Sequence, residues 1–450
     1  MDSPVSIEKQ NNLAIIKIDN PPVNALSHAV RAGIMDALKS FEQDRACEVA
    51  ILICTGRTFI AGADITEFNK PPVPPTTPDT LLALGACQKP VVAVLHGNVL
   101  GGGLETALAC SYRIAESNTR LGLPEVTLGL IPGASGTQML PRLVGVESAL
   151  EMITSGRPAI ASSDAGRILV DELIEPGSYE QRLELAINYA QSIALNKGEV
   201  RHLSKVVLEK SVNHDQLFAD WRQKMAKKKR GLMAAQACIE SIENAVLLPF
   251  DEGIKREREL FQECRQSSQS GAMRHAFFAE RTSAKVDNLD QSVEAGSVDS
   301  VGVIGAGTMG VGIAMCFANA GLQVTLIEMD QERVDAGLDR ISQNYAQSVK
   351  RGVISDTKAN DYLTAIKGST NYEDLADVDL VVEAAFESME VKHDIFAKLD
   401  QVCKPETILA SNTSYLDLDV IAEATSRADR VVGLHFFSPA HIMKLLEIVR

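Results

Sequence analysis

The stretch from Gly97 to Glu105 reads GNVLGGGLE and follows the apolar run Val91–Leu95. An unbroken apolar run of this length is typical of a buried strand. Glycine has no Cβ, so three in a row let the backbone approach a neighbour or a ligand closely. We predict a strand at 91–95 and a helix that begins near Gly103. The Gly102 N–H then lies near a helix N-terminus, where backbone donors are unpaired.

Two further stretches add acid/base chemistry: residues 59–65 read FIAGADI, and residues 123–133 read LPEVTLGLIPG. Two carboxyls beside one water, here Glu105 and Glu125, can act as base and acid when their pKa values differ. Paired backbone N–H donors can hold negative charge on a thioester carbonyl oxygen. Singly, a glycine turn is a tight connection and a Pro-Glu pair is a first helical turn. Together and in this order they favour addition of water to an unsaturated thioester.

Residues from about Val5 to about Lys285 resemble the crotonase (enoyl-CoA hydratase/isomerase) superfamily, which has a ββα-spiral fold. The resemblance implies that the Ala63 and Gly102 N–H groups form an oxyanion hole. It also implies that Glu105 activates water and that Glu125 protonates the α-carbon. The same pair could move a double bond from the 3- to the 2-position. The matching motifs are NPPVNAL at 20–26, AGADI at 61–65, GGGLE at 101–105 and IPGASGTQ at 131–138.

A second pattern begins at the buried strand SVGVI, residues 300–304, which runs into GAGTMG at 305–310 and a helix-like segment, 311–320. The next strand, 324–327, ends in Glu328, 23 residues after Gly305 (328 − 305). This context is typical of a Rossmann dinucleotide site, although an ordinary βα turn is the alternative. We expect Glu328 to accept the ribose hydroxyls and to favour NAD over NADP. The residues expected at the cofactor pyrophosphate are Gly305, Gly307, Met309 and Gly310.

The C-terminal motifs resemble L-3-hydroxyacyl-CoA dehydrogenase; they are ASNTS at 410–414, GLHFFSP at 433–439 and MKLLE at 443–447. Alone, a histidine such as His435 is more often a satisfied core residue. The resemblance implies that His435 takes the proton of the 3-hydroxyl group while hydride passes to NAD. It further implies that Glu447 orients the imidazole and that Ser414 holds the substrate oxygen.

Three more residues match cofactor positions of the dehydrogenase family. Glu387 and Lys392 correspond to positions beside the nicotinamide ribose, and Ser438 stands where the family usually has asparagine. The resemblance therefore implies NAD as the cofactor, with one contact altered. The eight cysteines show no CxxC and no metal-like Cys/His spacing, so we predict no metal site and reduced thiols.

A hydratase fused ahead of this dehydrogenase resembles the multifunctional enzymes of fatty-acid β-oxidation, of the peroxisomal type and its bacterial relatives. The resemblance implies hydration of trans-2-enoyl-CoA to L-3-hydroxyacyl-CoA and oxidation of that product to 3-ketoacyl-CoA with NAD. A thiolase partner is left open and is not indicated. The expected location is the cytoplasm for a bacterial chain and the peroxisome for a eukaryotic one.

Two alternatives stay open. The chain could be a non-catalytic scaffold that binds acyl-CoA and NAD, which predicts eroded catalytic positions, whereas here those positions are intact. It could also be a crotonase-type isomerase or hydrolase without net hydration. With 59 acidic and 44 basic residues, the net charge of −15 disfavours nucleic acid as a partner. The sequence contains no apolar run long enough to insert stably in a membrane.

We expect an α/β chain in four parts: a crotonase core at 1–180, a helical extension at 181–284, a linker at 285–298 and a Rossmann-type NAD-binding domain at 299–450. The proline-rich segment 71–78 is expected to be an extended loop, facing the substrate or serving as a spacer. Hydroxyacyl-CoA dehydrogenases continue into a helical substrate-binding domain, and this domain would follow residue 450. We therefore expect this chain to hydrate its substrate but to dehydrogenate poorly.

Overall fold

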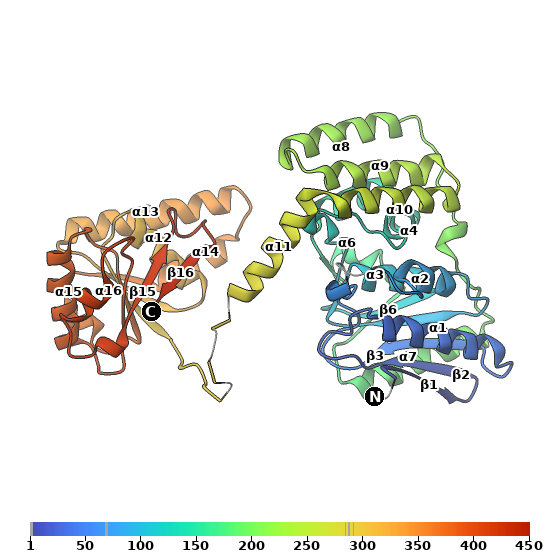
Figure 1. Ribbon diagram of the computed structural model, residues 1–450, viewed down its shortest axis with the longest axis horizontal. Helices are drawn as coiled ribbons and strands as arrows, with labels where there is room; N and C mark the ends of the chain where they lie inside the picture. Colours follow the sequence, from blue (N-terminus) through green and yellow to red (C-terminus); the bar gives the residue numbers. More distant parts are fainter. Residues whose placement is uncertain (1–2, 68–70, 284, 287–288, 291) are drawn as a thin grey trace. The chain divides into compact units, whose positions relative to one another are not determined.

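The computed structural model describes residues 3–67, 71–283, 285–286, 289–290 and 292–450. They form two compact units, Met1–Asp287 and Asn288–Arg450 (Figure 1). The predicted linker at 285–298 includes the division between the units, and three of its residues, 287, 288 and 291, lie outside the described residues.

The first unit is built on a six-stranded sheet in the order β1-β2-β3-β4-β6-β9. β1 and β2 form an antiparallel hairpin, and its turn residue Asn11 has a φ of 55°, which asparagine tolerates well. The other neighbours in the sheet are parallel. The strands are β1 (Val5–Gln10), β2 (Leu13–Ile18), β3 (Val49–Cys54), β4 (Val91–Leu95), β6 (Tyr112–Glu116) and β9 (Glu172–Ile174).

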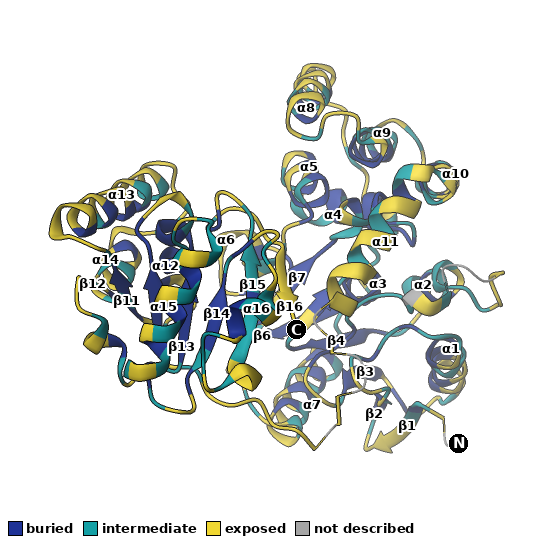
Figure 2. Ribbon diagram, turned by 60° about the vertical axis from the view of Figure 1, so that its left-hand side comes forward, coloured by how far each residue is buried: buried dark blue, intermediate teal, exposed yellow. Residues whose placement is uncertain are grey.

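Both faces of the sheet are covered at the inner strands β3 and β4, which explains why these two read as continuous apolar runs, whereas the edge strand β1 is mostly exposed. Ile51 and Ile53 of β3 belong to one cluster with buried residues of α7 (Tyr179–Leu195). Ala50 and Leu52 belong to the other cluster, together with buried residues of α1 (His28–Gln43). Figure 2 shows β3 and β4 as buried strands within the unit and β1 as exposed at its edge.

The segments that leave the carboxyl ends of these strands build the first site. A small sheet, β5-β7-β8, and several short helices follow one another there, and the predicted strand and helix at 91–109 are β4 and α3. The elements are η1 (Ile65–Glu67), α2 (Thr77–Gly85), β5 (Asn98–Leu100), α3 (Gly102–Ala109), β7 (Arg120–Gly122), η2 (Glu125–Leu128), α4 (Gly136–Val144), α5 (Val146–Ser155), β8 (Ala159–Ile160) and α6 (Asp164–Arg167).

Two expectations about this unit need correction. The loop expected at 71–78 is shorter, because α2 begins at Thr77 with Pro78 in its first turn, where proline is tolerated. The helical extension is interrupted at 196–213, a fully described stretch whose one regular element is η3 (Leu203–Lys205). Of its later helices, α9 (Met233–Leu247) and α10 (Phe250–Gln266) pack on α4 (Figure 1). The helix α8 (His214–Lys228) packs on α9, and α11 (Ser268–Ser283) contacts α10 and η2.

The second unit is a seven-stranded sheet in the order β12-β11-β10-β13-β14-β15-β16, parallel except for β16. Its first six strands have the doubly wound order of a Rossmann fold. The strands are β10 (Ser300–Ile304), β11 (Gln323–Ile327), β12 (Ile366–Ser369), β13 (Leu380–Glu383), β14 (Ile408–Ser411), β15 (Val431–Phe436) and β16 (Leu446–Val449). The helices are α12 (Thr308–Asn319), α13 (Gln331–Lys350), α14 (Asp356–Thr364), η4 (Tyr372–Leu375), α15 (Met389–Val402), α16 (Leu418–Ala422) and η5 (Ala428–Arg430).

All eight cysteines are free thiols, and seven of them are buried. In the described part of the chain, no group of three or more His, Cys, Asp or Glu side chains is arranged to hold a metal ion. None of the helices there combines the length and the apolar character needed to cross a bilayer.

Candidate active sites

Glu105 is placed by the glycine run that precedes it. The helix α3 begins at Gly102, and Glu105 lies in its first turn, 3% exposed. A Cβ on Gly103 would lie 1.9 Å from the Ile60 carbonyl oxygen, so only glycine lets the helix start pack against the segment after β3. The sequence therefore buries a carboxyl group at the carboxyl edge of the sheet.

The Glu105 carboxyl accepts two backbone hydrogen bonds. Its Oε1 receives the Ala134 N–H at 2.9 Å and the Gly136 N–H at 2.8 Å. Burial raises the pKa of Glu105 to about 7, and the two amide bonds, which favour the carboxylate, act against that rise. A group with this pKa is suited to take a proton near neutral pH.

In the part of the chain that the structure describes, Glu125 Oε2 lacks the amide donors that Glu105 has. Glu125 begins the short helix η2, and its Oε2 is buried without a hydrogen-bond partner among the described residues. Burial, and after it the charge of Glu105, raise the pKa of Glu125 well above its usual range. A Cβ on Gly101 would lie 2.8 Å from Glu125 Oε1, so the glycine makes room for the acid. Glu125 is thus suited to stay protonated while Glu105 is charged.

The two expected oxyanion donors lie next to each other. A Cβ built on Gly102 would lie 3.4 Å from the Ala63 nitrogen, which places the two backbones side by side. The loop that carries Ala63 is tied down by the Leu26 N–H, which donates to the Gly62 carbonyl at 3.0 Å. Gly102 is the first residue of α3, where N–H groups have no partner within the helix.

Two buried glutamates that the sequence reading missed adjoin the two sites. Glu257 lies on α10 and Glu383 at the end of β13, and both are fully buried. Each interrupts an apolar pattern: Glu257 lies between Ile254 and Leu260 on the buried face of α10, and Glu383 closes the run that begins at Leu380. A charged residue inside an apolar stripe is the signal that could have identified them.

The glycine-rich loop after β10 has the geometry of a phosphate cradle. Gly305 has a φ of 98°, and a Cβ on Gly310 would lie 1.6 Å from the Gly305 carbonyl oxygen. Gly307 caps α12 without a side-chain hydrogen bond, and a Cβ there would meet nothing within 4 Å. The first amides of α12, including that of Met309, have no partner within the helix, and such unpaired donors suit a pyrophosphate.

Glu328 follows β11 at the same edge of the sheet. Its Oε1 accepts the Ala306 N–H at 2.9 Å, and its Oε2 accepts the Met329 N–H at 2.9 Å. The carboxylate thus braces the glycine-rich loop at the position expected to face a ribose.

The predicted dehydrogenase residues form a connected chain of hydrogen bonds. His435 of β15 stands opposite Glu447 of β16 in the antiparallel ladder, and its Nδ1 lies 2.7 Å from Glu447 Oε2. The other ring nitrogen, Nε2, lies 3.3 Å from the Ser414 hydroxyl. The carboxylate therefore orients the ring, and the free nitrogen faces a hydroxyl group.

Glu387 extends this chain toward the core. Its Oε1 accepts the Ser414 N–H at 3.0 Å, and its Oε2 lies 3.0 Å from Lys392 Nζ. Lys392 is 1% exposed, and its ammonium also contacts Glu383 Oε1 and Oε2 at 3.0 and 2.9 Å. Lys392 is therefore enclosed by carboxylates, and Glu387 is the more exposed of the two residues expected beside the cofactor.

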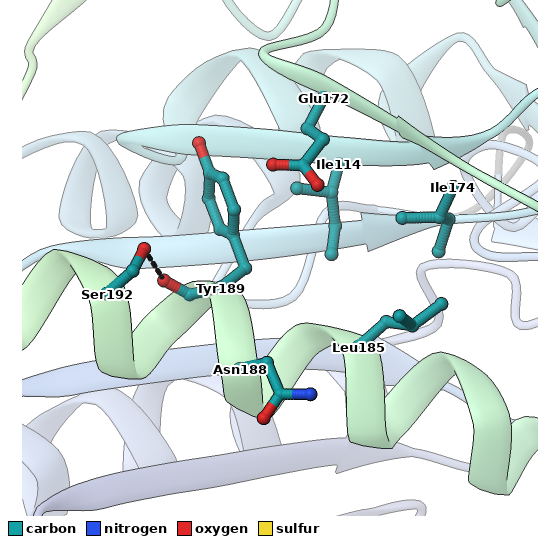
Figure 3. Close-up of a pocket in the computed structure, with 7 residues that line it drawn as sticks. All are labelled: Ile114, Glu172, Ile174, Leu185, Asn188, Tyr189 and Ser192. Atoms are coloured by element: carbon teal, nitrogen blue, oxygen red, sulfur yellow. Dashed lines mark hydrogen bonds between the residues drawn. The ribbon is translucent and has the colours of Figure 1, made fainter.

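Ser438 lies three residues beyond His435 and is exposed. In the described structure, no hydrogen bond ties its side chain to the network above. A separate pocket, between β6, β9 and α7, is lined by Ile114, Glu172 and Tyr189 among others (Figure 3). It contains none of the predicted site residues.

Comparisons with known proteins match a different family to each of the two units. Residues 8–228 match the family described as enoyl-CoA hydratase/isomerase, and residues 300–450 match the NAD-binding domain of 3-hydroxyacyl-CoA dehydrogenase. The peroxisomal bifunctional enzyme of Cavia porcellus is 40% identical over 98% of this chain and 61% of that protein. That of Danio rerio is 41% identical over 98% and 60%. The chain thus spans about three fifths of these relatives' length.

Among solved structures, 3-hydroxybutyryl-CoA dehydrogenase from Escherichia coli is 41% identical over 34% of this chain and 32% of that chain, with a TM-score of 0.33. The family matches confirm the predicted α/β class with a crotonase-type domain and a Rossmann-type domain, and they confirm NAD as the dinucleotide of the second. Residues 8–228 belong to the enoyl-CoA hydratase/isomerase family and residues 300–450 to the 3-hydroxyacyl-CoA dehydrogenase family, so the chain is a fusion of the two.

Proposed function

We propose that the chain hydrates trans-2-enoyl-CoA to L-3-hydroxyacyl-CoA and oxidises that product to 3-ketoacyl-CoA with NAD, as an enzyme of fatty-acid β-oxidation. Acyl-CoA thioesters are the proposed substrates of both sites. The observation that carries the proposal is the pair of glutamates beside two adjacent backbone donors: Glu105 is held by two amides, and Glu125 has a buried Oε2 without a partner among the described residues.

In the hydratase site, Glu105 would take a proton from water and Glu125 would deliver one to the α-carbon. The amide-bonded Glu105 holds charge, and Glu125, which lacks such bonds at Oε2, holds a proton. The Ala63 and Gly102 N–H groups would stabilise charge on the thioester oxygen, and losing one such donor costs about 2.7–4 kcal/mol in other enzymes.

In the dehydrogenase site, His435 Nε2 would take the proton of the 3-hydroxyl group. NAD, when bound, accepts the hydride. Glu447 stabilises the imidazolium from Nδ1, and Ser414 positions the substrate oxygen on the other side of the ring. We propose that Glu387 meets the cofactor and that Lys392 supports it from beneath.

The scaffold alternative requires that the catalytic groups be lost or separated. Both sets of groups are present, and hydrogen bonds link Ser414, His435 and Glu447 in one site. Isomerisation of 3-enoyl-CoA removes a proton from the α-carbon and adds one to the γ-carbon, so it needs a base and an acid. The charged Glu105 and the protonated Glu125 together supply both, and we propose isomerisation as a second activity of the first site.

The test is a spectrophotometric assay with crotonyl-CoA, read first without NAD and then with it. Loss of the enoyl absorbance in the first stage reports hydration, and NADH in the second stage reports oxidation. Glu105→Gln should abolish both signals, whereas His435→Ala should abolish only NADH. Hydration that survives Glu105→Gln would contradict the assignment.

For the compartment, we propose the peroxisome in a eukaryotic host and the cytoplasm in a bacterial one. The names of the similar Cavia and Danio proteins, both peroxisomal, support the first case. A fluorescent fusion imaged beside a peroxisomal marker in the native host tests it.

A further inference from the structure

Four consecutive backbone amides in the first unit donate alternately to two buried carboxylates. The segment lies between α3, which carries Glu105, and α10, which carries Glu257. Each carboxylate therefore holds every second amide of the same short loop. The donors to Glu105 Oε1 are the Ala134 and Gly136 N–H groups at 2.9 and 2.8 Å, and the donors to Glu257 are Ser135 N–H at 2.7 Å to Oε1 and Thr137 N–H at 3.0 Å to Oε2.

The loop needs such support because its conformation is strained. Ser135 has a φ of 90°, in the left-handed region that non-glycine residues rarely adopt. It is the N-cap of α4, yet its hydroxyl makes no capping bond, and Oγ is buried without a partner among the described residues. The amide bonds to Glu105 and Glu257 thus replace the ordinary cap and hold the strained backbone in place.

Glu257 is itself fixed in one position. It is fully buried, and it also accepts the Thr137 hydroxyl, which in turn lies 2.6 Å from the Ser241 hydroxyl of α9. Within the described residues neither Glu105, Glu125 nor Glu257 forms an ion pair, so hydrogen-bond donors hold the Glu257 carboxyl in place.

We propose that Glu257 is a positioning residue of the hydratase site, which fixes the loop at residues 134–137 and thereby sets where its amides meet the carboxylate of Glu105. This inference rests on the proposed hydration. Glu257 has no contact with the substrate in this role. It acts on the direction in which Glu105 presents its oxygen to water, and a misplacement of about 1 Å can cost about 10²-fold in rate.

The two carboxyl groups also interact electrostatically. Burial, and after it the charge of Glu105, raise the pKa of Glu257 to about 8, against the pull of its hydrogen bonds. The amide bonds from Ala134 and Gly136 favour the charged form of Glu105, so a loop displaced by the loss of Glu257 should let the pKa of Glu105 rise. The other titratable groups linked to Glu257 are Glu125 of η2 and Cys238 of α9, whose thiol pKa burial raises well above its usual range.

The experiment compares Glu257→Gln with Glu259→Gln in the full chain. Glu259 lies on the same helix with a 63% exposed side chain, so it controls for the loss of one charge from α10. For crotonyl-CoA hydration we expect Glu257→Gln to lower kcat by about 10- to 100-fold with KM changed by less than about threefold. The acidic limb of its pH profile should move to higher pH, because displaced amides no longer lower the pKa of Glu105. Values equal to those of the control in kcat and pH profile would overturn the proposal.

Two additions keep the outcome decisive. If Glu257→Gln does not fold, Thr137→Val removes only one donor to Glu257; a pH profile shifted in the same direction supports the proposal, and an unshifted one overturns it.

If the unmodified chain fails to hydrate crotonyl-CoA, the proposed function fails by itself. The positioning role is then read from the infrared band of protonated carboxyl groups. Its titration should move to higher pH in Glu257→Gln, and an unchanged titration would overturn the role.

Discussion

At the scale of single residues, Glu105 and Glu125 show how one functional group acquires two roles. Both are taken out of water, but two amides point at Glu105 and none of the described donors points at Glu125 Oε2. Because the charge of Glu105 adds to the burial of Glu125, the two groups resist ionising together. Near neutral pH the charge lies on Glu105 and the proton on Glu125.

We predict that Glu105→Gln and Glu125→Gln each lower hydratase turnover by about 10²–10⁴-fold with little change in KM, since each removes one proton-transfer group. Glu151→Gln, on the exposed side of α5, should leave turnover unchanged. The measurement is steady-state hydration of crotonyl-CoA, and full activity in either active-site variant would refute the roles.

The pH dependence follows from the same pair. Glu105 acts as a base only when ionised, so kcat/KM for hydration should rise as the pH passes about 7. Glu125 acts as an acid only when protonated, and its raised pKa keeps it so above that point; the rate should fall again at higher pH. A profile that is already flat from pH 5 upward would show that Glu105 is not the base.

Glu328 should decide between the two dinucleotides. Its carboxylate lies at the loop edge where a ribose is expected, so a 2′-phosphate would meet a negative charge. Calorimetric titration should show tighter binding of NAD than of NADP. Glu328→Gln, which keeps an acceptor for the Ala306 N–H, should tighten NADP binding by about tenfold, or ~1.4 kcal/mol. Equal affinities in the unmodified chain would mean that Glu328 points away from the ribose.

At the scale of elements, the junction of β10 and α12 depends on a glycine contact. Because a Cβ on Gly310 would overlap the Gly305 carbonyl, Gly310→Ala must displace the loop and should abolish NAD binding while hydration persists. Gly296→Ala is the control, because a Cβ there meets nothing within 4 Å. Titration of NAD by intrinsic fluorescence checks both variants, and undiminished binding to Gly310→Ala would contradict the cradle.

Apolar runs and glycine positions in the sequence predicted the strands and helices that depend mainly on neighbouring residues. The run Val91–Leu95 is the strand β4, and the helix expected from Gly103 begins one residue earlier. The strands β5, β7 and β8 were not predicted, because they are two or three residues long and depend on distant partners. The contact of Glu257 with Ser135 spans 122 positions, and no local pattern could indicate it. The sequence showed Glu257 as a charged residue within an apolar stripe, but it did not show that Glu257 contacts Ser135.

At the scale of the whole molecule, each unit has its own hydrophobic cores. The clusters of the first unit and those of the second share no residue. We predict two calorimetric unfolding transitions. NAD at about 100 times its Kd should stabilise the second unit by about 2.7 kcal/mol and raise one transition by roughly 5–10 °C. An equal rise of both transitions would show that the units unfold together.

The pairing of β15 with β16 has a consequence for how this dyad can be recognised and how it can evolve. His435 and Glu447 meet because they are opposite in an antiparallel ladder, and not because of the number of residues between them. The connecting segment 437–445 can therefore gain or lose residues without moving the dyad. A slip of one residue in the pairing, by contrast, turns Glu447 to the other face of the sheet. Sequence searches that require a fixed spacing between this histidine and its glutamate will overlook relatives whose connecting loop has drifted in length.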